Sequence, residues 1–194
     1  MIYIDDHIEE MDLEQALAEV SAQRREKALR FRHEAGRRQS VAAYRLLQRA
    51  LREEYGITEP QELVIGEHGK PSLKDHPEIH FSLSHCRVAV ACAVSDSPVG
   101  IDIESIRSYR PELAAYVLSE ADLQEVMQAE RPDVEFIKRW TQKEAFLKLT
   151  GQGISNEMKH LDMSGTESHT EVDLEAGYVW TVMQFSNDRS SLAR

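Results

Sequence analysis

The sequence predicts an α+β fold of two similar lobes, each with a small, mostly antiparallel sheet packed with helices. The chain has 194 residues, which is enough for two small lobes with a substantial core. Helical and strand patterns both occur, and in each half a helical region runs into a short group of strands. We therefore expect an N-terminal lobe at residues 1–98 and a C-terminal lobe at residues 99–194.

The composition is that of an ordinary soluble globular protein, with 41% hydrophobic and 29% charged residues. The chain has no apolar run of about 18 residues and no basic start followed by an apolar segment, so we expect neither a membrane span nor a signal peptide. Cys86 and Cys92 fit no metal or redox spacing. They predict buried free thiols in a reducing compartment, by default the cytoplasm.

Charge is unevenly distributed along the chain. The net charge of −11 argues against nucleic acid as the main partner. Residues 24–52, however, contain ten Lys or Arg and only two acidic residues. A block of like charge marks either a solvated basic face or an anion site, and the sequence leaves both open.

The first elements follow from capping and periodicity. Residues 3–4 suggest a short strand, and Asp12 can cap the helix after it. We expect Gly36 to break this helical region. A second helix is predicted from about residue 37 to residue 55, because apolar residues recur at helical spacing and Gly56 follows.

A turn and a hairpin come next. Lys70 lies in the glycine- and proline-flanked turn of residues 66–71, where it can be a phosphate contact or simply an exposed lysine. Residues 79–83 and 88–94 are predicted to pair as strands, with His85 at the tight connection. In that place His85 can cap the turn or contact a ligand.

An acidic pair ends the strand predicted at residues 99–104. Side chains two apart in a strand share a face, so Asp102 and Glu104 project together. Two neighbouring carboxylates repel each other unless a cation neutralises them, and Mg²⁺ prefers oxygen ligands. A solvated strand end is the alternative.

Two helices and a strand are predicted in the C-terminal half. Ser119 resembles the start of a capping box, and the strongest helix spans about residues 133–150 before Gly151. Glu144 and Lys148 lie at i and i+4 on this helix, so they form either a surface pair or part of a metal and phosphate site. Residues 178–185 are a plausible strand.

Four motifs then form one pattern in order and spacing: GKP at residues 69–71, FSLSH at 81–85, VGIDIE at 99–104 and WTQKEAFLKLTGQGI at 140–154. Together they resemble the 4′-phosphopantetheinyl transferase superfamily, in particular the long, pseudodimeric type that activates surfactin synthetase. This resemblance covers roughly residues 20–155.

The resemblance implies an enzyme with its active site in the cleft between the lobes. Such an enzyme transfers the 4′-phosphopantetheine arm of coenzyme A to a serine of an apo acyl or peptidyl carrier protein and releases adenosine 3′,5′-bisphosphate. It implies a Mg²⁺-dependent transferase of the holo-[acyl-carrier-protein] synthase type, as in fatty acid biosynthesis. Mn²⁺ also suits the oxygen ligands of such an enzyme. We expect no nucleic-acid or membrane partner, and a monomer, because two lobes in one chain complete the cleft.

The resemblance also assigns roles to residues. It implies that the metal ligands are Asp102, Glu104 and Glu144. It also implies that Glu144 and Lys148 are catalytic, with Glu144, or a water that it orders, as the general base. The implied coenzyme contacts are Lys70, Ser84, His85 and Lys143, with Arg25 and Arg38 taken from the basic segment. Arg24 and Arg37 are further candidates for the 3′-phosphate.

Two competing functions remain open from the sequence. One is a catalytically silent module that binds coenzyme A or a carrier protein, although such a module does not need to hold a metal on the pyrophosphate. The other is a metal-dependent phosphoryl hydrolase. For the carrier protein itself, we expect docking on the basic segment of residues 24–52, including Arg45 and Arg49, and on apolar surface near the cleft.

Overall fold

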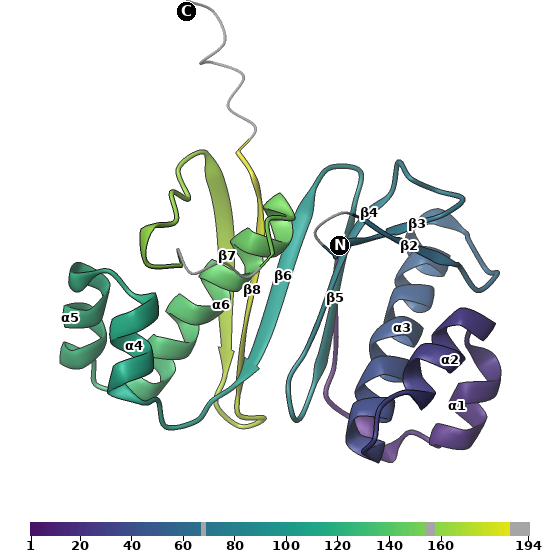
Figure 1. Ribbon diagram of the computed structural model, residues 1–194, viewed down its shortest axis with the longest axis horizontal. Helices are drawn as coiled ribbons and strands as arrows, with labels where there is room; N and C mark the ends of the chain where they lie inside the picture. Colours follow the sequence, from purple (N-terminus) through teal and green to yellow (C-terminus); the bar gives the residue numbers. More distant parts are fainter. Residues whose placement is uncertain (67–68, 154–157, 187–194) are drawn as a thin grey trace, which may run out of the picture.

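The computed structural model describes residues 1–66, 69–153 and 158–186, and it confirms the α+β fold class (Figure 1). Among these residues the strands form two three-stranded sheets, ordered β1-β5-β4 and β6-β8-β7, and a two-stranded ribbon, β2-β3. All strand pairs are antiparallel. Helices flank the pair of sheets at its two ends, which gives the two-lobed arrangement.

The elements fall into two groups along the chain. The first comprises β1 (Ile2–Asp5), the 3-10 turn η1 (Ile8–Glu10), α1 (Leu13–Glu19), α2 (Ala22–Leu29), α3 (Glu34–Tyr55), β2 (Leu63–Ile65), β3 (Pro71–Leu73), β4 (His80–His85) and β5 (Val90–Ser95). The second comprises β6 (Val99–Ser105), α4 (Pro111–Val117), α5 (Glu120–Gln128), α6 (Pro132–Thr150), the 3-10 turn η2 (Met158–His160), β7 (Thr166–Asp173) and β8 (Tyr178–Phe185).

Capping residues place most helix ends where the sequence predicts them. Asp12 accepts hydrogen bonds from the backbone of the first turn of α1, and Ser119 accepts one from Asp122 N at the start of α5. Gly56 and Gly151 end α3 and α6 in the left-handed conformation, with φ of 69° and 73°. These local signals are sufficient because a cap satisfies backbone groups of its own helix.

The predicted helix break at Gly36 is wrong. Gly36 lies inside α3, which begins at Glu34, and the preceding region contains two helices rather than one. Ser21 separates them, because its hydroxyl accepts the Arg24 N–H and so caps α2.

The predicted hairpin is confirmed, but its turn is displaced. In the β4–β5 register Ser84 pairs with Ala91 and His85 with Val90, so both residues belong to the strand and not to the turn. The chain reverses at residues 86–89, where Cys86 N donates to Ala89 O at 2.9 Å. Both cysteines are buried free thiols, as expected.

Four elements escaped prediction: α4, β2, β3 and β7. Strands β2 and β3 have three residues each, too few for a periodic pattern. Strand β7 is an edge strand of sequence TESHTEVD with no buried position, so it lacks the apolar alternation that marks a strand.

The two groups of elements share an apolar interface between their sheets. Ala91 and Ala93 of β5 pack in one cluster with Ile101 and Ile103 of β6 and with Trp180 of β8. All five are at least nine-tenths buried. The division of the chain after residue 98 stays a prediction, because this core is common to both groups. None of the described helices combines the length and apolarity needed to cross a membrane.

Candidate active site

Asp102 lies at the centre of a buried polar cluster formed by β4, β6 and α6. Its side-chain oxygen Oδ1 accepts hydrogen bonds from Lys148 Nζ at 2.7 Å and Ser84 Oγ at 2.8 Å. Lys148 Nζ also donates to Ser84 Oγ at 2.8 Å, so the three groups close a triangle. The other oxygen, Oδ2, is buried and has no hydrogen-bond partner among the described residues. Asp102 itself is 4% exposed.

Gly100 allows this cluster to form, because β6 passes directly against α6. A Cβ atom on Gly100 would lie 2.0 Å from Ala145 O and 2.5 Å from Leu149 N. Asp102 lies two residues after Gly100 on the same face of the strand, and there it contacts Lys148 of α6. Ile101 and Ile103 point the other way, into the shared core.

Two further carboxylates complete the acidic group. Glu144 is 8% exposed on α6, and burial, followed by the charge of Asp102, raises its pKa. Burial and then Asp102 also raise the pKa of Glu104. The buried Trp140 Nε1–H lies close enough to lower the Glu104 pKa in part, yet it makes no hydrogen bond of normal geometry with any described residue. The contact between Asp102 and Lys148 is therefore present, and their charges affect both glutamates, but a joint role of the four residues stays a prediction.

The cluster suits a hard divalent cation in the kind of ligand it offers. It provides carboxylate oxygens, which Mg²⁺ prefers, and the unpartnered Oδ2 of Asp102 is an acceptor that a cation would satisfy. Within residues 1–66, 69–153 and 158–186, however, no three His, Cys, Asp or Glu side chains are grouped closely enough to hold a metal ion together.

A cavity of about 270 Å³ borders the cluster. Glu144 and Lys148 line one side, and Phe81, Ser82 and Leu83 of β4 line the other. The turn before β3 and the two glycines at residues 151 and 153 complete it. The cavity lies between elements of both lobes, so it is a cleft into which a substrate can bring a phosphate next to Lys148.

Lys70 contributes to this cavity in a different way from the one predicted. Its ammonium donates to Leu149 O at 3.0 Å and Val99 O at 3.4 Å, and burial lowers its pKa. The carbonyl of Leu149 belongs to the last turn of α6, where carbonyl groups lack helical partners. Lys70 thus joins the turn before β3 to the end of α6, and its contact with nucleotide remains a prediction. Residues 67–68 of the predicted turn and Ile154 of the last motif lie outside the described residues.

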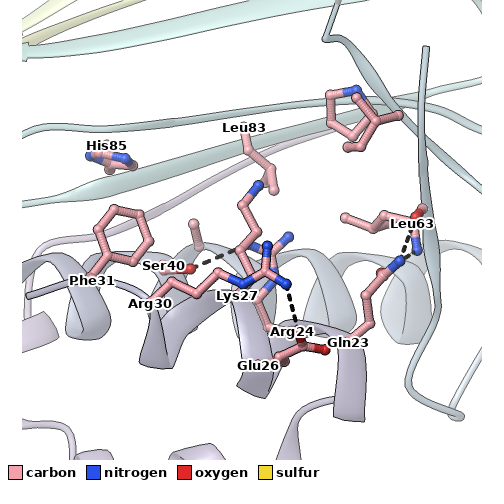
Figure 2. A pocket seen from close by; sticks show the side chains of 13 residues that line it. Gln23, Arg24, Glu26, Lys27, Arg30, Phe31, Ser40, Leu63, Leu83 and His85 are labelled. Carbon is pink, nitrogen blue, oxygen red and sulfur yellow. Dashed lines mark hydrogen bonds and ion pairs between the residues drawn. The ribbon is translucent and has the colours of Figure 1, made fainter.

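A second, larger cavity of about 560 Å³ lies between α2 and β4 and carries most of the positive charge near the site. Figure 2 shows its lining, in which Arg24, Lys27 and Arg30 of the helical side face the strand that carries Leu83 and His85. Pro71 and Leu83 line both cavities. The two cavities are therefore neighbours, and one extended ligand can occupy both.

Arg24 and Lys27 are the cations of this cavity that lack an acidic partner among the described residues. Arg24 is 8% exposed, donates to Ser40 Oγ at 3.3 Å and lies 5.0 Å from the centroid of the Tyr44 ring. Burial lowers the pKa of both, and the Arg24 charge lowers that of Lys27 further. An anion bound in this cavity would raise the pKa values of Arg24 and Lys27 again, because it favours their charged forms.

Three residues predicted to contact the coenzyme lie elsewhere. Arg25 donates to the carbonyls of Leu17 and Ala18 at the end of α1. Arg38 donates to the Ile8, Glu9 and Met11 carbonyls and pairs with Glu34. Lys143 is buried, and its ammonium donates to Met158 O at 2.9 Å.

These three side chains satisfy backbone carbonyl groups, so the structure does not bring them to either cavity. The basic segment divides instead by helix face, with the face of α2 that carries Arg24, Lys27 and Arg30 turned to the larger cavity. The residues that the prediction missed, Lys27, Arg30, Phe31 and Ser40, had one available signal. It concerns Lys27 alone, which lies three residues after Arg24 and so on the same face of α2.

His85 lies between the two parts of the site. It lines the larger cavity, and it follows Ser84, which belongs to the Asp102 cluster. Although the residue is exposed on its strand, the protein around its ring, followed by the Lys148 charge, lowers its pKa. A neutral imidazole at this point can become charged when an anion arrives.

The arginines expected to dock a carrier protein are on a separate surface. Arg45 pairs with Glu19 at 3.2 Å, and Arg49 pairs with Glu53 at 2.9 Å. They line a third cavity that shares no lining residue with the other two. Docking on Arg45 and Arg49 stays a prediction.

Comparison with known proteins identifies similar sequences. The family model of the 4′-phosphopantetheinyl transferase superfamily matches residues 98–182, the segment that contains Asp102, Glu104, Glu144 and Lys148. A 4′-phosphopantetheinyl transferase of Bacillus subtilis is 30% identical over 183 residues, which are 91% of this chain and 81% of the relative.

Two further relatives show the same similarity. The 4′-phosphopantetheinyl transferase psf-1 of Bacillus pumilus is 38% identical over 78% of this chain and 66% of its own length. The 4′-phosphopantetheinyl transferase Sfp of Bacillus subtilis strain 168 is 28% identical over 79% of this chain and 70% of its own length.

Proposed function

The chain belongs to the 4′-phosphopantetheinyl transferase superfamily, and on this basis we propose that it transfers the 4′-phosphopantetheine arm of coenzyme A to a serine of an apo carrier protein, releasing adenosine 3′,5′-bisphosphate. The relatives support this transferase function and not the silent binding module considered from the sequence. Acyl and peptidyl carrier proteins are both acceptors of this chemistry. The finer assignment to the Mg²⁺-dependent holo-[acyl-carrier-protein] synthase type is part of the proposal.

One observation carries the proposal. Glu144 and Lys148 line a cleft, and Lys148 also bonds to the buried Asp102 behind it. The neighbouring cavity is lined by Arg24 and Lys27, which have no acidic partner among the described residues. Coenzyme A has a matching distribution of charge, with a pyrophosphate in its middle and a 3′-phosphate at its nucleotide end. The order along the ligand corresponds to the order of the cavities, which meet at Pro71 and Leu83.

In this proposal the acidic cluster binds the metal. Asp102, Glu104 and Glu144 hold Mg²⁺, for which Mn²⁺ can substitute. A bound cation of this kind polarises the phosphoryl group under attack and stabilises the charge that develops on the leaving phosphate. The unpartnered Oδ2 of Asp102 supports this assignment.

Glu144 and Lys148 have the catalytic roles. The carrier serine is a weak nucleophile, so its proton must be removed as its oxygen attacks the phosphorus that bears the pantetheine arm. As the base we assign Glu144 or a water that it orders, because Glu144 lines the cleft beside Lys148. Lys148 carries a positive charge into the cleft and neutralises the leaving bisphosphate.

The nucleotide end of the coenzyme binds in the larger cavity. Arg24 and Lys27 contact the 3′-phosphate, with Ser40 beside Arg24. They take the role first expected of Arg25 and Arg38, whose guanidinium groups are engaged with backbone carbonyls. His85 lies between this end and Lys148, so it is placed to contact the phosphates in the middle of the ligand. The lobe of residues 1–98 then binds the nucleotide, and the lobe of residues 99–194 supplies metal ligands and catalytic groups.

The mass of an apo carrier protein after incubation with this protein, coenzyme A and Mg²⁺ tests the proposal. We expect a gain of one phosphopantetheine arm that disappears with EDTA and with Glu144→Gln. Carrier proteins from fatty acid, polyketide and peptide synthesis are assayed in parallel. Free phosphopantetheine without a modified carrier would show hydrolysis instead, and no product with any carrier would favour a silent binding module.

Two expectations accompany the proposal. We expect a monomer, which light scattering tests against a mass near 22.2 kDa. We also expect a cytoplasmic location, where coenzyme A and apo carrier proteins are available, and fractionation tests it.

A further inference from the structure

The two oxygens of the Asp102 side chain have different surroundings. Oδ1 accepts two hydrogen bonds, from Ser84 Oγ and Lys148 Nζ, whereas the buried Oδ2 accepts none from the described residues. A buried acceptor without a partner is costly, since it loses its water and gains nothing in return. The asymmetry therefore indicates a ligand that occupies Oδ2 in the working enzyme.

The two donors on Oδ1 are not equivalent. The Lys148 side chain is 30% exposed and lines the cleft, where its charge is also attracted to any phosphate that binds. Ser84 is 6% exposed, and its hydroxyl donates to Asp102. When a phosphate shares the Lys148 ammonium, the serine hydroxyl still holds Oδ1.

Strand β4 carries a matched pair of hydroxyls on this face. Ser82 lies two residues before Ser84, and its Oγ accepts the backbone N–H of Ile101 at 3.1 Å. Both serines thus connect β4 to β6, across elements that share no strand pairing. One hydroxyl fixes the backbone of β6, and the other fixes the side chain of Asp102.

We propose that Ser84 is a positioning residue for the metal ligand Asp102: its hydroxyl holds Oδ1 so that Oδ2 is presented to the divalent cation. This inference rests on the metal site of the proposed function and assigns Ser84 a role other than the direct coenzyme contact implied by the resemblance. Partners that orient metal ligands typically contribute about 10- to 100-fold to metal affinity. The effect of Ser84 should therefore appear in metal binding itself.

The test compares Ser84→Thr with Ser84→Val in the full-length protein. The two side chains add nearly the same volume to a buried place, so the hydroxyl is their main difference. Mn²⁺ binding is followed through the electron paramagnetic resonance signal of the free ion. It is measured once without coenzyme A and once with saturating coenzyme A, and carrier protein is absent in both cases. Thr should keep the wild-type dissociation constant for Mn²⁺, and Val should raise it about 10-fold or more.

Two controls accompany the measurement. Ser84→Ala removes the hydroxyl without adding atoms, so it tests the same loss even if the larger valine prevents folding. It should also raise the dissociation constant for Mn²⁺ about 10-fold or more. Ser82→Ala removes the neighbouring hydroxyl, which accepts the Ile101 N–H and makes no bond to Asp102 among the described residues. It should lower the melting temperature and raise the dissociation constant for Mn²⁺ less than Ser84→Ala does.

Each other outcome overturns the inference. Equal Mn²⁺ affinity of the Thr and Val variants would show that the hydroxyl does not position Asp102. Loss of coenzyme A affinity alone, measured by calorimetry without metal, would return Ser84 to a direct coenzyme contact. Absence of Mn²⁺ binding to the wild-type protein in both conditions would remove the metal site, while the separate carrier mass assay would still decide the transferase function.

Discussion

Replacing Gly100 by alanine should both destabilise the protein and disable its candidate active site. The new Cβ would lie 2.0 Å from Ala145 O, 2.5 Å from Leu149 N and 3.0 Å from Leu149 Cα. All three are backbone atoms of α6, so no side-chain rotation can relieve the contact. Strand β6 and helix α6 would have to move apart by more than an ångström to reach ordinary contact, which begins at 3.4 Å.

The size of the effect follows from this separation. Overpacking a well-packed core costs about 1–3 kcal/mol, and a clash with backbone places Gly100→Ala at or above about 3 kcal/mol. The same movement would break the 2.7 Å contact between Lys148 Nζ and Asp102 Oδ1. Displacement of catalytic groups by about 1 Å costs about 100-fold in rate, so we expect a loss of transfer activity of that order.

Urea denaturation measures the stability, and the carrier mass assay measures the transfer rate. Gly36→Ala is the matched control, because its Cβ would meet the Phe31 ring at 2.9 Å, and Phe31 is 41% exposed and can move aside. Alanine also favours a helix over glycine, so the control should stay within about 1 kcal/mol of wild type. A Gly100→Ala protein with wild-type stability and rate would refute the close packing of β6 on α6.

Three further predictions concern the cations around the clefts. Lys70→Met should lower the unfolding free energy by about 1–3 kcal/mol, because it leaves the Leu149 carbonyl without its donor. Unchanged stability in urea denaturation would exclude this link between the lobes. Lys27→Ala should weaken coenzyme A binding about 10-fold in calorimetry and leave the affinity for 3′-dephospho-coenzyme A unchanged. The control Arg25→Ala should change neither affinity. Equal losses of affinity for both ligands would show that Lys27 does not contact the 3′-phosphate. His85 has a pKa below the usual 6.5, so it is neutral at pH 7 and should take up a proton when phosphates bind. Coenzyme affinity should then rise from about pH 8 to about pH 6, and a His85→Gln protein with the same rise would contradict this role.

Local sequence patterns were sufficient for the elements that carry the acidic cluster. Strand β6 and helix α6 have the bounds expected from apolar periodicity and from Gly151, within one residue at each end. Their periods also decide which side chains share a face, so Asp102 and Glu104 project together, as do Glu144 and Lys148. The four motifs added the family and therefore the reaction.

Local patterns failed where the element itself is short or exposed. The β2–β3 ribbon and β7 have no apolar alternation to detect, and α4 is a single short helix that begins at Pro111. The break between α1 and α2 depends on one capping hydroxyl, that of Ser21. Gly36 was a misleading signal, because a glycine without a positive φ is tolerated within a helix.

The sequence by itself determined the fold class, the two elements that carry the acidic cluster and the family. Only the tertiary structure decided where each cation is used: Arg24 and Lys27 at the larger cavity, Lys70 and Lys143 on backbone carbonyls, and Lys148 on Asp102. The physical reason is that a helix or strand follows from neighbours along the chain, whereas a long cationic side chain is directed by acceptors far away in sequence. Lys148 and Asp102 are 46 residues apart, and Lys70 and Leu149 are 79 apart, so no local pattern records either contact.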